Sequence, residues 1–269
     1  MADNELGSFL RANREAVSPE AAGLPSGNRR RTPGLRRSEL ATLANVSVEY
    51  LTRLEQGHDR HPSAEVIVAL AEALDLSTDE RVHLHRLTKA SMGAACQPPS
   101  HTVRPSVLTL LDRMEPTPVV VVNYLTDVLA FTTGFAKLSR PTGLLDGDQP
   151  NLARYVFTDD RACTTYPDWG HIADERAAVL RTAAALGDPH SAEMAKELTA
   201  SAGVEFSNRF ESSGDLPARF GLERWNLPGV GGLRLNVEML EIPGGDEHLL
   251  IAYLPADEAT ESVLNQLTS

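Results

Sequence analysis

The stretch SELATLANVSVEYLTRLEQG, which begins at Ser38, constrains the fold of this chain more than any other segment. Apolar side chains at Leu40, Leu43 and Ala44 recur at helical spacing, and Ser38 before them is a good N-cap. Asn45 then tolerates the positive φ that a tight turn requires. These residues predict a short helix followed by a fixed turn.

A second short helix is predicted directly after that turn. Ser47 can cap it, Leu51 and Leu54 are spaced to face inward, and Gly57 suits its end because glycine adopts positive φ without strain. Two helices at such a corner are typical of a helix-turn-helix, whose second helix enters the major groove of DNA. The alternative is that the two helices form an ordinary corner of a helical core. The residues expected to contact DNA from this helix are Ser47, Glu49, Tyr50, Thr52 and Arg53.

Charge is distributed unevenly along the chain. Residues 1–91 contain 12 basic and 13 acidic residues, whereas residues 92–269 contain 13 basic and 24 acidic residues, so the net charge of −12 belongs mostly to the second part. No acidic residue lies between Glu20 and Glu39. The loop there is expected to bring a cationic patch to DNA phosphates or the minor groove, an ordinary exposed basic loop being the alternative. The arginines of this patch are Arg29, Arg30, Arg31, Arg36 and Arg37.

The first ninety residues are expected to form five helices. One helix covers residues 5–15, Ser63 can cap a fourth, and the segment from Ser77 to Glu80 has the form of a capping box for a fifth. The segments SELATLANVSVEYLTRLEQG and PSAEVIVALAEALDL resemble the phage-repressor-like XRE regulators. Within that group, GLRRSELA, VSVEYLTRLEQG and ERVHLHRL resemble the MmyB-like regulators of actinobacteria. This resemblance extends over nearly the whole chain and implies a transcription regulator with a C-terminal ligand-binding domain.

Histidines and cysteines do not combine into a metal site in this sequence. His83 and His85 are two residues apart, so they point to different sides of a helix, and no cysteine or carboxylate spacing completes a ligand set. The two cysteines, Cys96 and Cys163, form no motif. We therefore predict no metal, no disulfide framework and no cofactor.

A stretch of small, polar and proline residues, SMGAACQPPSHTVR, divides the chain. We expect a helix-turn-helix domain over residues 1–90, this linker over 91–104 and a ligand-binding domain over 105–269. The second domain should begin with a helix at Pro105–Met114 and close with a helix at Asp257–Leu267, with a helical middle section. The strands expected in it are 119–123, 128–132, 216–226, 233–239 and 248–254.

The order of helix, two strands, helices and three strands is that of a PAS-like domain, in which helices lie against one face of a curved antiparallel sheet. The MmyB-like resemblance implies the same fold, through ARYVFTD, YPDW, EFSNRF and LPGVGGLRLNVEML. The chain departs from that family at Phe210, where tryptophan is usual, and at Leu227 and Ser213 or Gly214, where histidines are usual. These departures weaken any transfer of a polar ligand contact. The expected fold class is α plus mixed α/β: an N-terminal five-helix repressor-like domain and a C-terminal PAS-like α+β domain with an antiparallel sheet.

A sheet curved against helices can enclose a pocket. The resemblance favours a small apolar ligand there, such as a fatty acid or a secondary metabolite, although the same side chains would equally build a filled core. A domain that covers a protein partner, as in an antitoxin, is the alternative function. The residues expected to line the pocket are Val120, Val122, Leu129, Phe131, Leu235, Val237, Leu250 and Ala252.

Enzymatic activity is not expected, because the sequence has no glycine-rich phosphate loop, no GxSxG motif and no cysteine and histidine pairing; GVGG at 229–232 fits a turn within a hairpin. No run of about eighteen apolar residues and no signal region occurs, so we expect a cytoplasmic protein that does not enter a membrane. One repressor-like domain contacts few base pairs. We therefore expect a homodimer on a double-stranded DNA operator.

Overall fold

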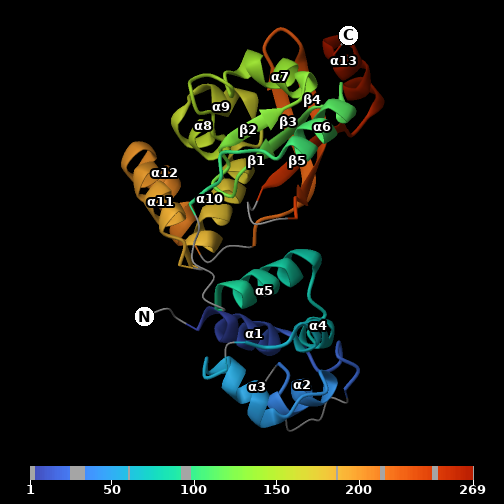
Figure 1. Cartoon of the computed structure of the whole chain (residues 1–269), viewed down its shortest axis with the longest axis vertical. Coiled ribbons are helices and arrows are strands. Elements are labelled where there is room, and N and C mark those ends of the chain that lie inside the picture. Colours follow the sequence, from blue (N-terminus) through green and yellow to red (C-terminus); the bar gives the residue numbers. More distant parts are fainter. Residues whose placement is uncertain are drawn as a thin grey trace. The chain divides into compact units, whose positions relative to one another are not determined.

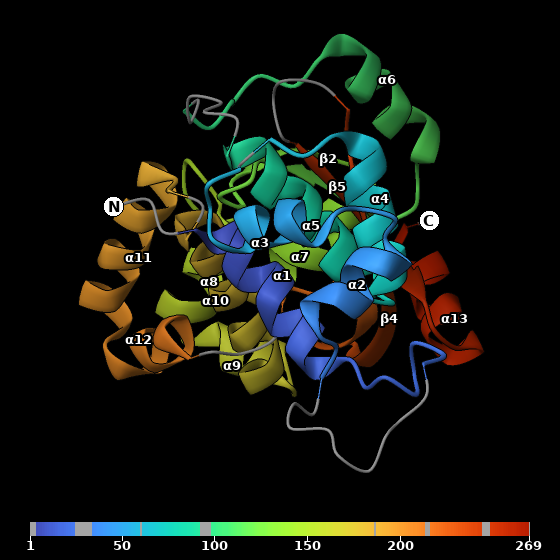
Figure 2. The same cartoon turned by 90° about the horizontal axis from the view of Figure 1, so that it is seen from below.

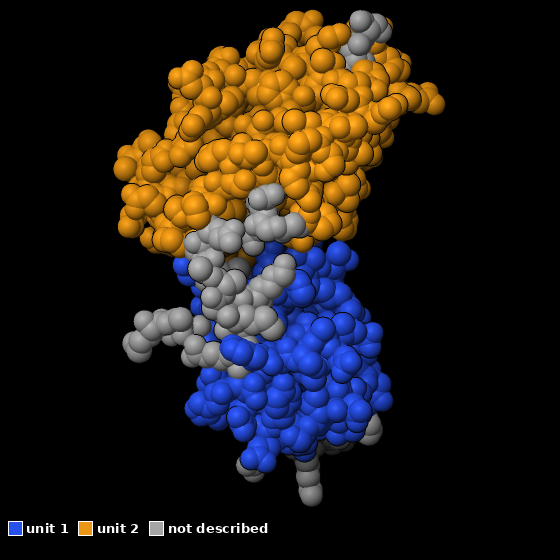
Figure 3. Space-filling model, in the orientation of Figure 1, with its two compact units in different colours: residues 1–96, 185–187 blue, residues 97–184, 188–269 orange. Residues whose placement is uncertain are grey.

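The structure is a computed structural model of the chain. It describes residues 4–24, 34–59, 61–91, 98–185, 187–212, 216–243 and 248–268. The chain divides into two compact units (Figure 3): the first unit comprises residues 1–96 and 185–187, and the second comprises residues 97–184 and 188–269. Each unit contains a hydrophobic core of its own.

The described residues of the first unit form five helices (Figure 1), as predicted. They pack their apolar sides around a shared core in which Leu10, Leu40, Leu51, Leu54 and Leu70 are fully buried. The helices are α1 (Glu5–Ala16), α2 (Arg37–Leu43), α3 (Val48–Glu55), α4 (Ala64–Ala73) and α5 (Thr78–Ser91).

Local hydrogen bonds fix the ends of these helices at several predicted positions. Ser47 Oγ accepts from the backbone N–H three residues later at 3.0 Å, which starts α3. The capping box before α5 is complete: Ser77 N–H donates to Glu80 Oε2 at 2.8 Å, and Glu80 N–H donates to Ser77 Oγ at 3.3 Å. Asn45 has φ +52° and Gly57 has φ +72°, so both adopt the left-handed backbone predicted for them.

The start of α2 differs from the prediction. The helix begins at Arg37, so Ser38 lies inside its first turn and does not cap it. Glu39 has the capping role instead, because its carboxylate accepts from the backbone N–H of Arg36 at 2.7 Å. Of the three apolar residues at helical spacing, Leu40 and Ala44 are buried, whereas Leu43 is 39% exposed near the end of this short helix.

A buried ion-pair network connects α1, α2 and α3, and the sequence analysis did not anticipate it. Glu55 accepts from Arg14 Nε at 2.6 Å and from Arg37 Nε at 2.7 Å. The side chains of Glu55 and Arg14 are only 1% and 6% exposed. Arg14 also donates from Nη1 to the carbonyl oxygen of Leu35 at 2.8 Å. The network therefore satisfies its buried charges and fixes the end of α3 against the two neighbouring helices.

His83 on α5 makes the stability of the first unit depend on pH. Its ring packs edge-on against Phe9, with 5.0 Å between ring centroids. Burial, and then the nearby Arg86, lower the pKa of His83 to about 4. The unfolded chain binds this proton with a pKa of about 6.5, so the contribution of His83 to stability is present above about pH 6.5 and is lost as pH falls toward about 4.

We therefore expect His83→Gln to lose less stability than the wild-type chain when pH falls from about 7 to about 4.5. Hydrogen exchange of peptides from α1 and α5 at each pH measures the difference between the two proteins. Identical pH dependence in both would contradict the assignment to His83.

The described elements of the second unit follow the predicted general order of a helix, two strands, a series of helices, three strands and a closing helix. The elements are α6 (Pro105–Met114), β1 (Val119–Val122), β2 (Val128–Phe131), α7 (Thr133–Ser139), the 3₁₀ helix η1 (Arg140–Thr142), α8 (Leu152–Thr158), α9 (Arg161–Thr165), α10 (Trp169–Ala185), α11 (Pro189–Ala202), α12 (Val204–Glu211), β3 (Phe220–Leu227), β4 (Gly231–Glu241), β5 (Leu249–Pro255) and α13 (Glu258–Thr268). The leading helix has its predicted bounds. The strands and the closing helix are displaced from their predicted bounds by a few residues at most.

The strands form one antiparallel sheet in the order β2-β1-β5-β4-β3. The β3–β4 hairpin pairs Phe220 with Glu238 at one end and Leu227 with Gly231 at the other. Gly229 has φ +76° in the connection, which confirms a turn at the start of GVGG, whereas Gly231 and Gly232 already belong to β4. β3 lies at one edge of the sheet, because β4 is its only strand neighbour within the described residues.

Helices cover both faces of the central strands (Figure 2). On one face, Val120 and Val122 belong to the large core beneath α7–α10. On the other face, Val119 and Val121 pack in a smaller cluster with Val107 of α6. All four valines of β1 are therefore fully buried. A strand covered on both faces needs no alternation of apolar and polar residues, which explains the uninterrupted VVVV sequence.

Candidate nucleic-acid interface and ligand site

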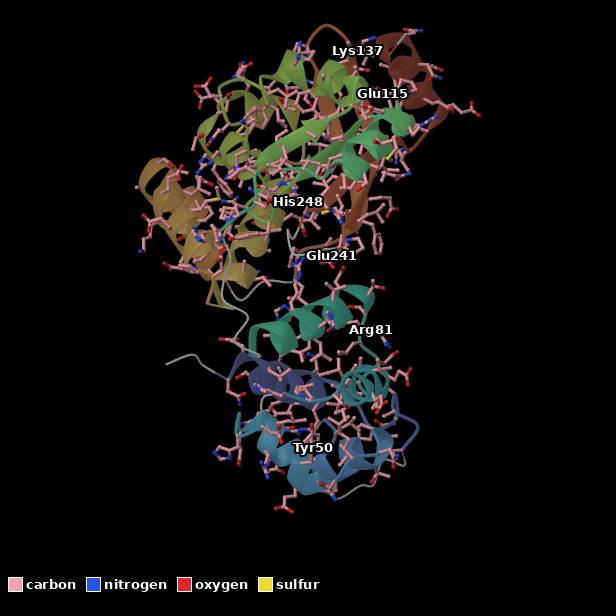
Figure 4. The ribbon with its side chains drawn as sticks, in the orientation of Figure 1. Tyr50, Arg81, Glu115, Lys137, Glu241 and His248 are labelled. Carbon is pink, nitrogen blue, oxygen red and sulfur yellow. The ribbon has the colours of Figure 1, made fainter. Side chains whose placement is uncertain are left out.

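The outward side of α3 carries the residues predicted to contact DNA. Glu49 and Arg53 are exposed and Thr52 is half-buried. Tyr50, labelled in Figure 4, is also half-buried, since its ring packs against the core of the first unit. Burial, and then the Asp59 carboxylate, raise the pKa of Tyr50 above its ordinary value, so its hydroxyl stays protonated and can donate a hydrogen bond.

Arg53 lies at the end of this surface and makes a long, exposed ion pair. Its Nη2 is 3.8 Å from Asp59 Oδ2, and its side chain is 56% exposed. Such an exposed ion pair contributes about 0–1 kcal/mol, so it leaves the guanidinium free to exchange Asp59 for another acceptor. An open surface hollow of about 370 Å³ adjoins it, lined by Arg53, Gly57, His58, Asp59 and His61.

The arginines of the predicted cationic patch differ in their exposure and in their contacts. Arg29, Arg30 and Arg31 lie outside the described residues. Arg36 is exposed directly before α2. Arg37 donates to the buried carboxylate of Glu55, so part of its charge serves the fold of the first unit. Its side chain remains 39% exposed.

The residues predicted to line a ligand pocket do not share one face of the sheet. Val120, Val122, Leu235 and Val237 belong to the large core beneath the helices. Leu250 and Ala252 instead lie on the opposite face with α6, so their placement in the same pocket is wrong. β5 reads LLIAYL without alternation, and its pairing with β1 and β4 directs the neighbouring Ile251 to the large core.

Two further pocket residues lie at the edge strand β2. Phe131 is 38% exposed, with its ring centroid 6.1 Å from that of Phe135. Leu129 is half-buried and belongs to neither core cluster. A register shift in the pairing of β1 with β2, between Val121 and Val122, interrupts the alternation that the prediction assumed. The large core is filled by bulky side chains, among them Trp225, Tyr253, Phe135 and Phe206.

A groove between α10 and the edge strand β3 opens instead on this unit. Its volume is about 40 Å³, and among the eight predicted pocket residues only Val237 lines it. The groove is lined by His171, Ile172, Glu175, Arg176, Ala218, Phe220, Gly221, Leu222, Glu223, Val237 and Met239.

Polar side chains meet beneath this groove, a feature that the sequence analysis missed. Arg176 Nη2 is 3.5 Å from Glu223 Oε1, and the residues are 4% and 8% exposed. Trp225 Nε1 donates to Glu223 Oε2 at 2.8 Å. Burial, and then the charge of Glu223, raise the pKa of Tyr166 well above its ordinary value. Glu223 and Trp225 alternate along β3, and that spacing was the available signal that both point into the core.

At two of the positions where the chain departs from the family pattern, the side chain makes apolar contacts. Leu227 is 1% exposed in the large core. Phe210 stacks on Phe206 with 5.5 Å between ring centroids and an interplanar angle of 28°. Ser213 and Gly214 lie outside the described residues. Leu227 and Phe210 therefore contribute packing where a polar ligand contact was in question.

Within the described ranges, no helix combines the length and the apolar character that crossing a membrane requires. A comparison with curated proteins found no match. A family model for a helix-turn-helix domain matches residues 5–84, which include α1–α4 and the first half of α5. The model described as MmyB-like transcription regulator ligand binding domain matches residues 103–267, more than half of the chain. The chain therefore belongs to the MmyB-like transcription regulators and combines a DNA-binding helix-turn-helix domain with a ligand-binding domain of that family.

Proposed function

We propose that α3 is the recognition helix of this regulator and that Ser47, Glu49, Tyr50, Thr52 and Arg53 form its contact surface in the major groove. The observation that carries this proposal is the division of α3 into two sides. Leu51, Leu54 and Glu55 are buried, whereas the proposed contact residues are exposed or half-buried. Residues early in a recognition helix reach furthest toward base edges. Arg36, exposed before α2, is placed to add a phosphate contact.

Replacing Arg53 by Ala is expected to weaken operator binding by about 1–3 kcal/mol and to relax the preference for one base pair, because a bidentate contact to guanine is lost. The measurement is the affinity for an operator selected by the wild-type chain, together with all single-base variants of it. Arg11→Ala is the control, since it removes the same charge from an exposed position on α1. Equal affinities of the Arg53→Ala and wild-type proteins would refute the role of Arg53.

For the rest of the chain we propose a domain organisation with residues 1–90 binding DNA, 91–104 linking, and 105–269 forming a PAS-like domain that senses a small apolar ligand. The antiparallel sheet with helices against its core face supports a PAS-like fold. The match to a ligand-binding domain model supports sensing. A fatty acid or a secondary metabolite is the proposed ligand class. Mass spectrometry of small molecules extracted from the purified chain tests this; a stoichiometric protein partner in place of a small molecule would favour the antitoxin-like alternative.

We further propose that the protein acts as a homodimer, joined through α6 and α13. On α6, Leu108 and Leu110 are 42% and 48% exposed although the helix buries Val107 and Leu111. A dimer can place two recognition helices about 34–36 Å apart on a two-fold symmetric operator. A ligand then regulates only if it binds one arrangement of the dimer better than the other.

Sedimentation equilibrium of the full chain is expected to show a dimer, and the double variant Leu108→Glu, Leu110→Glu is expected to shift it toward the monomer because charge replaces apolar contact area. Operator affinity measured beside it should fall in the same variant. A wild-type chain that stays monomeric at micromolar concentration would contradict the dimer proposal.

A further inference from the structure

The turn after α3 fixes a carboxylate beside the residues proposed to contact DNA. Gly57 has φ +72°, and its N–H donates to the carbonyl oxygen of Leu54 at 3.0 Å. The N–H groups of His58 and Asp59 both donate to the carbonyl oxygen of Arg53, at 2.9 and 3.2 Å. This is the Schellman arrangement that ends many helices. The backbone therefore places Asp59 next to Arg53 independently of the two side chains.

The same turn is held from α1. Asn4 Nδ2 donates to the carbonyl oxygen of Glu55, the last residue of α3, at 2.6 Å. A Cβ added at Gly57 would lie 2.6 Å from Asn4 Cγ, so a glycine is required where the turn passes the start of α1. The position of Asp59 relative to the end of α3 is thus determined on both sides of the turn.

Asp59 faces two of the proposed contact residues of α3. Its Oδ2 lies 3.8 Å from Arg53 Nη2, and its side chain is 27% exposed. Its charge also contributes, after burial, to the raised pKa of Tyr50. Among the described residues that line the hollow at the end of α3, Asp59 is the one with a carboxylate. A negative charge on a surface that meets DNA opposes binding unless it has another role.

The pairing with Arg53 supplies such a role. An arginine side chain loses much rotamer freedom when it meets a base edge, and a carboxylate at one end of the guanidinium restricts that freedom in advance. The remaining N–H donors can still pair with O6 and N7 of a guanine. Asp59 therefore lowers the ordering cost of a guanine contact.

The same carboxylate acts differently where the DNA presents no guanine. There Arg53 gains only a phosphate, for which Asp59 competes as an acceptor already in place. The paired arginine then adds little net charge to the surface, so it releases fewer counterions from DNA. Opposing the wrong partner in this way is a general route to specificity.

We propose that Asp59 determines sequence specificity by acting through Arg53. It orients the guanidinium for a guanine, and it withholds the guanidinium from phosphates elsewhere. Asp59 is a positioning residue, because it acts on DNA through Arg53. The inference rests on the proposed function of α3 as the recognition helix and adds the residue that controls its arginine.

Asp59→Asn keeps the size of the side chain and removes its charge. The affinity of the full chain is measured for the operator that the wild-type chain selects and for a scrambled duplex of the same length and composition. On the scrambled duplex we expect binding about 3-fold tighter, because Arg53 is released. The slope of log K against log salt should steepen there by about 0.9 per bound domain. On the operator we expect no gain, since lost orientation offsets lost competition.

Glu72→Gln is the matched control, because it removes the same charge from an exposed position on α4. If net charge alone mattered, both variants would bind the operator and the scrambled duplex more tightly in equal proportion. The ratio of the two affinities is expected to fall about 3-fold in Asp59→Asn and to keep its wild-type value in Glu72→Gln. An unchanged ratio in Asp59→Asn, or an equal fall in both variants, would overturn the proposal.

A double-mutant cycle tests whether Asp59 acts through Arg53. In an Arg53→Ala background, Asp59→Asn is expected to change neither the affinity ratio nor the salt slope, and a change of the same size as in the wild-type background would refute the pairing. The proposed function fails on a different result. Arg53→Ala with wild-type operator affinity removes the reading role of Arg53; a loss of operator affinity there, with an unchanged ratio in Asp59→Asn, keeps that role and removes only the role of Asp59.

Discussion

Replacing Glu55 by Ala is expected to lower the free energy of unfolding of the first unit by about 3–5 kcal/mol, because the change removes the buried carboxylate that pairs with both Arg14 and Arg37. Arg14 is 6% exposed, and Glu55 accepts its Nε at 2.6 Å. Without Glu55, Arg14 keeps the Leu35 carbonyl at 2.8 Å and the half-exposed Glu15 carboxylate at 3.3 Å, but it loses its shorter and buried carboxylate partner. Hydrogen exchange of peptides from α1 and α3 measures the loss in the full chain and separates it from changes in the second unit.

The control for this prediction is Glu49→Ala, which removes an exposed carboxylate from the same helix and should change the stability by no more than about 0.5 kcal/mol. A second comparison is the double variant Arg14→Met, Glu55→Met, which removes both buried charges and should recover much of the lost stability. A single Glu55→Ala variant as stable as Glu49→Ala would show that the network does not hold the five helices together.

Replacing Phe135 by Ala is expected to lower the free energy of unfolding of the second unit by about 3–5 kcal/mol, since it leaves a cavity in a filled core. Phe135 is fully buried on α7, and its ring centroid lies 5.6 Å from that of Tyr253 on β5. The ring therefore joins a helix to the middle of the sheet. Urea unfolding followed by tryptophan fluorescence reports this unit selectively, because Trp169 and Trp225, the two tryptophans of the chain, both lie in it.

Phe220→Ala is the matched control for Phe135→Ala. It deletes the same ring from a strand position that is 59% exposed, so the expected change is within about 0.5 kcal/mol. Comparable losses in the two variants would mean that the core around Phe135 relaxes to fill the cavity.

Local chemistry made the helix ends predictable. A serine hydroxyl that can accept from the backbone N–H three residues later specifies an N-cap at Ser47 and Ser77, whatever the rest of the molecule does. Positive φ at Asn45 and Gly57 likewise follows from side chains that tolerate it. Ser38 was mispredicted because the competing cap, the Glu39 carboxylate, lay one residue further along and started α2 earlier.

Helical spacing was enough to predict that the charged residues of the buried network face inward. It was not enough to predict which of them pair. Leu6, Leu10 and Arg14 follow one another at intervals of four, and Glu55 lies four residues after Leu51, so both charged residues are on inward faces. The sequence thus indicated that two charges point into the core. It did not indicate that they meet, because 41 residues separate Arg14 from Glu55 and only the packing of α1 on α3 brings them together.

The two-part organisation, the helix-turn-helix and the antiparallel sheet could be predicted because they depend on local periodicity, capping and turn chemistry. Which faces of the strands are covered could not be predicted in the same way, because it depends on packing between segments that are distant in sequence. Runs such as VVVV in β1 and LLIAYL in β5 are apolar on both sides, so they do not say which alternate residues face α7–α10 and which face α6. Cross-strand register fixes that choice, and it placed Leu250 away from the core that contains Ile251. The groove beside Arg176 could not be predicted either, because its walls come from α10 and from the paired strands β3 and β4, which are distant from α10 in sequence.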